Sequence, residues 1–97
     1  MGEHAIAIER EKLLKEFLIR RSIEPLEVRV RGDRASIVYD THTIHLNVKT
    51  EEWWIGWGCL INQVSGKLFE MIDTQRKALI WTAPIVWDLC KQAEGGA

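Results

Sequence analysis

The sequence has few of the features that assign a chain to a specialised class of protein. Its only cysteines, Cys59 and Cys90, lie far apart, so we expect two free thiols in a reducing compartment, with a single disulfide as the alternative. No apolar run approaches the roughly 20 residues that cross a bilayer, and the N-terminus lacks the features of a signal peptide. These absences predict a cytoplasmic protein with no membrane partner.

Neither sign of charge dominates. The chain carries 13 basic and 14 acidic side chains, for a formal net charge of -1, so it has no domain-wide basic footprint for nucleic acid. Its 97 residues, 46% of them hydrophobic and 28% charged, are typical of one small folded domain. We expect that domain to span residues 1–97, with frayed ends at 1–3 and 94–97.

The motifs of catalysis and cofactor binding are also missing. There is no phosphate-binding loop and no H-E-x-x-H zinc motif. His42 and His45 have no third ligand nearby in the sequence, whereas zinc needs three or four. Cys59 lies among apolar neighbours, where a thiol is normally inert. We therefore predict no enzyme activity, no cofactor and no metal site, with a composite site joining Cys59 to a histidine as the alternative.

The middle of the chain predicts a three-stranded antiparallel meander. A turn at Gly32-Asp33 sets Val28 opposite Ile37, and a second turn at Thr41-His42 sets Ile37 opposite Leu46. One face of this sheet is then apolar and carries Leu26, Val28, Val30, Ala35, Ile37, Tyr39, Ile44, Leu46 and Val48. The other face carries Glu27, Arg29, Arg31, Arg34, Ser36, Val38, Thr43, His45 and Asn47.

Helices are expected on both sides of this meander. Residues 4–22 form an amphipathic pattern that Pro25 ends. Thr50 is a candidate N-cap for a helix that carries apolar residues from Trp53 to Ile72, with a break near Ser65-Gly66. Residues 77–81 fit either a short fourth strand or a helix, and a final helix is expected over about 84–92. The predicted fold is α+β, with an N-terminal helix and two or three C-terminal helices packed on one sheet face.

Five tryptophans in so short a chain exceed what one core stripe can hide. On a helix, Trp53 and Trp57 share a face and are expected in the core, while Trp54 points about 100° away. Tryptophan is enriched where interfaces concentrate their binding energy. We therefore expect Trp54 and Trp87 to contact a partner, and we predict a small regulator or inhibitor that binds another protein or a second copy of itself.

The polar sheet face supports a second hypothesis, nucleic-acid binding. Its candidate residues are Arg29, Arg31, Arg34, His45 and Asn47, because a sheet can lie in a DNA groove and read base edges with such side chains. The order of three antiparallel strands and a helix is similar in topology to the plant AP2 domain and to phage-integrase arm-binding domains, although no sequence motif of either is present. It also resembles double-stranded RNA-binding domains, but the acidic pair Glu51-Glu52 stands where they carry a basic cluster.

Overall fold

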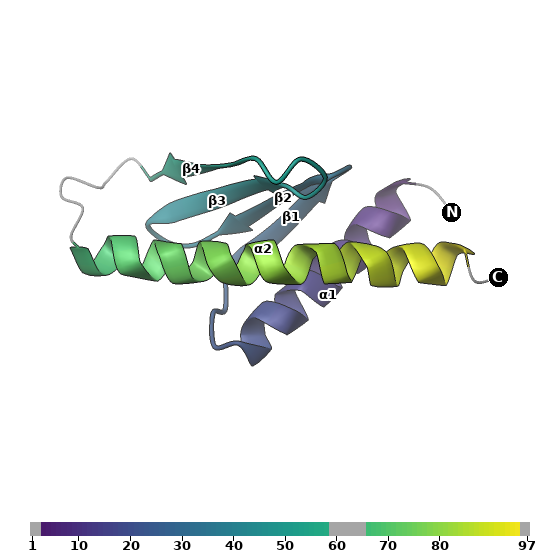
Figure 1. Cartoon of the computed structure of the whole chain (residues 1–97), viewed down its shortest axis with the longest axis horizontal. Coiled ribbons are helices and arrows are strands. Elements are labelled where there is room, and N and C mark those ends of the chain that lie inside the picture. The colour runs from purple at the N-terminus through teal and green to yellow at the C-terminus, as the bar shows by residue number, and fades with distance from the viewer. Residues whose placement is uncertain (1–2, 59–65, 96–97) are drawn as a thin grey trace.

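The computed structural model describes residues 3–58 and 66–95, which form two helices and one four-stranded antiparallel sheet (Figure 1). The elements follow the order α1 (Glu3–Arg20), β1 (Glu27–Arg31), β2 (Arg34–Val38), β3 (His42–Asn47), β4 (Trp53–Trp57) and α2 (Gly66–Gly95). The α+β class is confirmed. The predicted number of strands is wrong, because the sheet has a fourth strand, β4. The prediction of two or three C-terminal helices is also wrong, because the described C-terminal residues form one long helix. With four strands, the topology no longer resembles that of the three-stranded domains.

The first hairpin forms as predicted. Val28 pairs with Ile37 and Arg31 with Arg34, which leaves Gly32-Asp33 as the connecting residues. Gly32 has a φ of 59°, a left-handed conformation that glycine adopts without steric cost. The alternation of exposed and buried residues along β1 and β2 puts the arginines on the predicted outer face.

The second hairpin differs from its predicted register by two residues. Ile37 pairs with Ile44 rather than Leu46, because the turn lies at Asp40-Thr41, one residue earlier than predicted, where the Tyr39 amide donates to the His42 carbonyl. An even shift keeps every side chain on its predicted face, since the side-chain period of a strand is two. It also makes His42 the first residue of β3, on the apolar face, where it is buried.

Residues 53–57 form a strand, not the helix predicted for them. Thr50 is therefore no helix cap; the Asn47 carboxamide instead accepts the Lys49 and Thr50 amides in the β3–β4 turn. Tryptophan and isoleucine favour strands, and glycine at position 56 disfavours a helix. The part of the predicted helix over 59–65, with Cys59 and the expected break at Ser65, lies outside the described residues.

The C-terminal part of the chain is a single helix. α2 has 30 residues, which correspond to about 45 Å at the usual rise per residue, and it carries Pro84 inside it. Residues 77–81 are helical, so the fourth strand considered for them is absent. The predicted stripe of Leu79, Ala83, Val86 and Cys90 is buried, and this packing outweighs the backbone hydrogen bond that proline removes.

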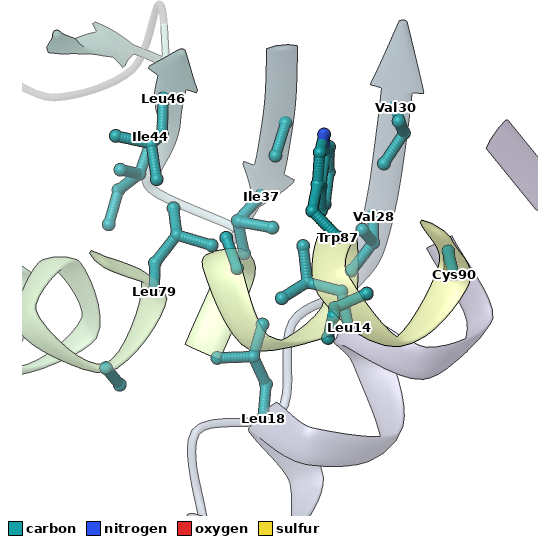
Figure 2. Packing of buried hydrophobic residues seen from close by; sticks show 14 of the residues in the cluster. Leu14, Leu18, Val28, Val30, Ile37, Ile44, Leu46, Leu79, Trp87 and Cys90 are labelled. Carbon is teal, nitrogen blue, oxygen red and sulfur yellow. The ribbon is translucent and has the colours of Figure 1, made fainter. Parts of the chain in front are cut away.

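Both helices pack on the apolar face of the sheet. Figure 2 shows Val28, Ile37 and Ile44 pointing toward α1 and α2, where Leu14, Leu18 and Leu79 meet them. Leu26 is the exception among the residues predicted for this face, because it precedes β1 and remains 67% exposed. Within the described residues, neither helix is long and apolar enough to cross a membrane.

Candidate binding surface

Strand β4 forms one edge of the sheet and carries three tryptophans. The sheet order is β1-β2-β3-β4, so among the described residues β4 pairs with β3 on one side only. His45 pairs with Trp54 and Thr43 with Gly56, and the Gly58 amide donates to the Thr41 carbonyl at 3.1 Å. In an antiparallel ladder, bonded and non-bonded residues alternate along each strand. The backbone groups of Trp54 and Gly56 therefore face β3.

The intervening residues of β4 direct their backbone groups away from the sheet. By the same alternation, these are Trp53, Ile55 and Trp57. No hydrogen bond to these outward groups is found within residues 3–58 and 66–95. A row of outward N–H and C=O groups is a template on which another strand can pair.

The tryptophans of β4 are all exposed, which corrects the prediction that Trp53 and Trp57 lie in the core. Trp53, Trp54 and Trp57 are 40%, 41% and 45% exposed. Alternation along the strand divides them between the two faces of the sheet. Together they surround the free edge with aromatic surface.

Contacts with α2 fix the two tryptophans on the helix-facing side. The Arg76 guanidinium lies 4.8 Å from the ring centroid of Trp53. The ring of Trp57 meets that of Phe69 edge to face at 6.4 Å. These contacts orient the rings without covering them, so both remain available to a neighbouring strand.

Trp54 belongs to a cluster on the outer face, the face turned away from the helices. Its ring stacks on that of His45 at 5.1 Å, and the Arg34 guanidinium lies 4.8 Å from its centroid. The Ser36 hydroxyl and His45 Nδ1 are hydrogen-bonded at 2.8 Å. Burial, and then the nearby positive charge of Arg34, lower the pKa of His45. The cluster spans β2, β3 and β4 and holds the Trp54 indole in place.

The arginines proposed for nucleic-acid binding also gather on the outer face. Arg29, Arg31, Arg34 and His45 line one hollow there. Glu27 pairs with Arg29 at 2.9 Å, and this hydrogen bond lowers the pKa of the Glu27 carboxyl. Asn47 is not part of the hollow's lining, because its side chain is engaged in the β3–β4 turn. The structure thus brings together four of the five candidate residues.

Trp87, the other tryptophan predicted at a partner surface, lies in the core. It is 9% exposed, and the Arg10 guanidinium lies 4.6 Å from its ring centroid. Its place on α2 turns the indole toward β1 and β2 (Figure 2). The prediction that Trp87 lies at the surface is therefore wrong. Trp81, which sequence reasoning assigned to an ambiguous segment, is instead 70% exposed on α2.

His42, one of the two histidines considered as metal ligands, is buried beside Tyr39 and Gln75. It is 2% exposed, stacks on Tyr39 at 5.1 Å, and contacts the Gln75 Oε1 atom through Nε2 at 2.6 Å. Because that carbonyl oxygen can only accept, Nε2 donates to it, and His42 Nδ1 is hydrogen-bonded with the Thr41 hydroxyl at 2.8 Å. Within the part of the chain that the structure describes, no three His, Cys, Asp or Glu side chains are grouped so as to hold a metal.

Comparison with known proteins yields no relative for this chain. No family model, no curated protein sequence and no solved structure matches it.

Proposed function

We propose that this chain is a non-catalytic protein-binding module that takes up an extended segment of its partner along the free edge of β4. The observation that carries this proposal is the combination of outward backbone groups and three exposed tryptophans on one five-residue strand. Addition of a strand to a sheet edge is an established mode of peptide recognition, in which the main chain supplies affinity and alternate side chains supply specificity. Such binding suits a small regulator or inhibitor.

The chemistry of the edge defines the partner segment. Its backbone pairs with Trp53, Ile55 and Trp57, and its alternate residues meet aromatic surface on the helix-facing side. On the outer face, the segment meets the indole of Trp54. An extended segment with apolar residues at alternate positions matches both faces, and proline within it would remove a required donor.

The test compares two tryptophan variants of the tagged protein in affinity capture from a lysate of its source. Trp54→Ala removes an indole beside the free edge, whereas Trp81→Ala removes a more exposed indole on α2 and serves as the matched control. We expect Trp54→Ala to cost about 2 kcal/mol of binding free energy, the scale of an interface hot spot, and Trp81→Ala to leave capture unchanged. Capture that survives Trp54→Ala unchanged contradicts the proposal.

A second function, nucleic-acid binding, is supported by the hollow that Arg29, Arg31 and Arg34 share on the outer face. Binding of this kind weakens steeply with salt, because neutralised phosphates release counterions. Capture with and without nuclease separates the two functions. A partner lost on nuclease treatment, and lost also when Arg29 and Arg31 are both replaced by alanine, would favour the nucleic-acid function over the protein-binding one.

A further inference from the structure

We infer that the segment that pairs with β4 is the β4 strand of a second copy of this chain, in an antiparallel, two-fold symmetric dimer. This inference rests on the proposed function and names the partner for the same edge. A closed dimer uses the same patch on both copies, so the patch must be complementary to itself. The sequence and register of Trp53–Trp57 meet that condition.

The two-fold axis passes beside Ile55, the central residue of the strand. An antiparallel pair about this axis sets Ile55 opposite the same residue of the other copy, and Trp53 opposite Trp57 of the other copy. These three residues have outward backbone groups in both copies. The pairing therefore satisfies every outward donor and acceptor of β4 at once, which a register displaced by one residue does not.

The outer faces of the two strands are complementary in size. In the same register, Trp54 of one copy lies opposite Gly56 of the other. Glycine leaves space for a large ring above the backbone. A side chain at position 56 is also disfavoured within one copy, because its Cβ would stand 3.3 Å from His45 Nε2. Each indole thus meets a glycine and the edge of an imidazole, and both copies contribute the same contacts.

The helix-facing side adds aromatic contacts of the same symmetry. Trp57 already meets Phe69 of its own α2, and the dimer sets Trp53 of the other copy beside this pair. Aromatic pairs directly opposite one another are among the favourable cross-strand combinations. The result is one continuous sheet of two four-stranded halves. A second copy therefore supplies both the backbone groups and the side chains that complement this tryptophan-rich edge.

The register makes a charge-swap experiment possible. Positions 53 and 57 face each other across the axis, so the double variant Trp53→Glu with Trp57→Glu opposes like charges twice per dimer. The double variant Trp53→Glu with Trp57→Lys opposes unlike charges twice. Both variants lose the same two indoles, and in both the new Glu lies where Arg76 contacts the residue at 53. Each variant is therefore the control for the other.

Sedimentation equilibrium over a range of protein concentrations measures the outcome. We expect the wild-type chain to dimerise, the Glu/Glu variant to be monomeric, and the Glu/Lys variant to dimerise with a Kd roughly a hundredfold lower than that of the Glu/Glu variant. Circular dichroism of both variants checks that they fold. A wild-type dimer that the Glu/Glu variant leaves intact overturns the inference, as does a Glu/Lys variant no better than the Glu/Glu one.

The proposed function and this inference fail differently. A wild-type chain that stays monomeric, yet captures a nuclease-resistant partner through Trp54, overturns the second-copy inference and leaves the protein-binding function standing. A chain that neither dimerises nor captures a protein through β4 overturns both. Ile55→Pro adds a backbone test, because it removes the N–H at the axis and is expected to abolish dimerisation.

Discussion

The two edges of the sheet differ in whether side chains bond to their outward backbone groups. At the β1 edge, the outward amide of Val30 donates to the Glu11 carboxylate of α1 at 2.9 Å, and Arg10 donates to the Gly32 carbonyl at 3.0 Å. At the β4 edge, tryptophans flank outward groups that nothing in the described residues satisfies. Natural sheets cover, charge or interrupt the edges that must not pair. The contrast supports the proposal that β4 pairs with a partner strand, whereas contacts with α1 cover the β1 edge.

The largest effect is expected where the protecting helix meets the core. Leu14 of α1 is fully buried, so Leu14→Ala removes packing and leaves a cavity. We expect a loss of about 2–5 kcal/mol in the free energy of unfolding, measured by urea denaturation. Ile8→Ala, at a half-exposed site on the same helix, is the control. Equal losses for the two variants would show that α1 does not anchor the β1 edge in this way.

A smaller effect is expected from opening the β1 edge directly. Glu11→Ala leaves the Val30 amide without its acceptor, and hydrogen bonds to charged groups contribute about 1.5–3 kcal/mol. Urea denaturation should show a loss in this range, whereas Glu16→Ala, at an exposed site on α1, should change stability by less than about 0.5 kcal/mol. If the variant also self-associates through β1, the protective role of Glu11 is established; unchanged stability would argue against it.

Closing the β4 edge should affect binding more than folding. Ile55→Pro removes an outward N–H but none of the bonds that Trp54 and Gly56 make to β3. Ile55→Ala loses the side chain and keeps the N–H, so the comparison isolates the backbone donor. We expect partner binding, measured by titration, to fall by about 1–3 kcal/mol in the proline variant relative to the alanine variant. Equal affinities would exclude strand addition at this edge.

The smallest effect concerns pH. Burial and Arg34 lower the pKa of His45 from its ordinary value of 6.5, so the unfolded chain takes up a proton at a pH where the folded chain does not. This contribution to stability is complete above about pH 6.5 and is lost as the pH falls through the lowered pKa. Thermal unfolding of the wild-type chain and of His45→Gln should diverge in that window. Parallel pH profiles would show that His45 plays no part.

The sequence predicted the hairpin at Gly32 and the two faces of β1–β3 because strand alternation and turn chemistry are local. It mispaired β2 with β3, since composition did not show that the turn lies at Asp40-Thr41, between the paired Tyr39 and His42, rather than one residue later. It misassigned Trp53–Trp57, whose apolar spacing also fits a helix stripe; the strand preference of tryptophan and the glycine at position 56 were the signals that could have found β4. Trp54 was selected for its exposure on a helix, and it is exposed on a strand instead.

Residue-by-residue amide hydrogen exchange along β4, measured at high protein concentration and after dilution, tests most directly whether this edge is open and pairs with a second copy. The amides of Trp54, Gly56 and Gly58 bond to β3 and should be protected at both concentrations. Those of Trp53, Ile55 and Trp57 should be protected only at high concentration, where a second strand covers them. Protection of all six amides at every concentration, or fast exchange of Trp53, Ile55 and Trp57 at both, would contradict an open edge that pairs with another copy.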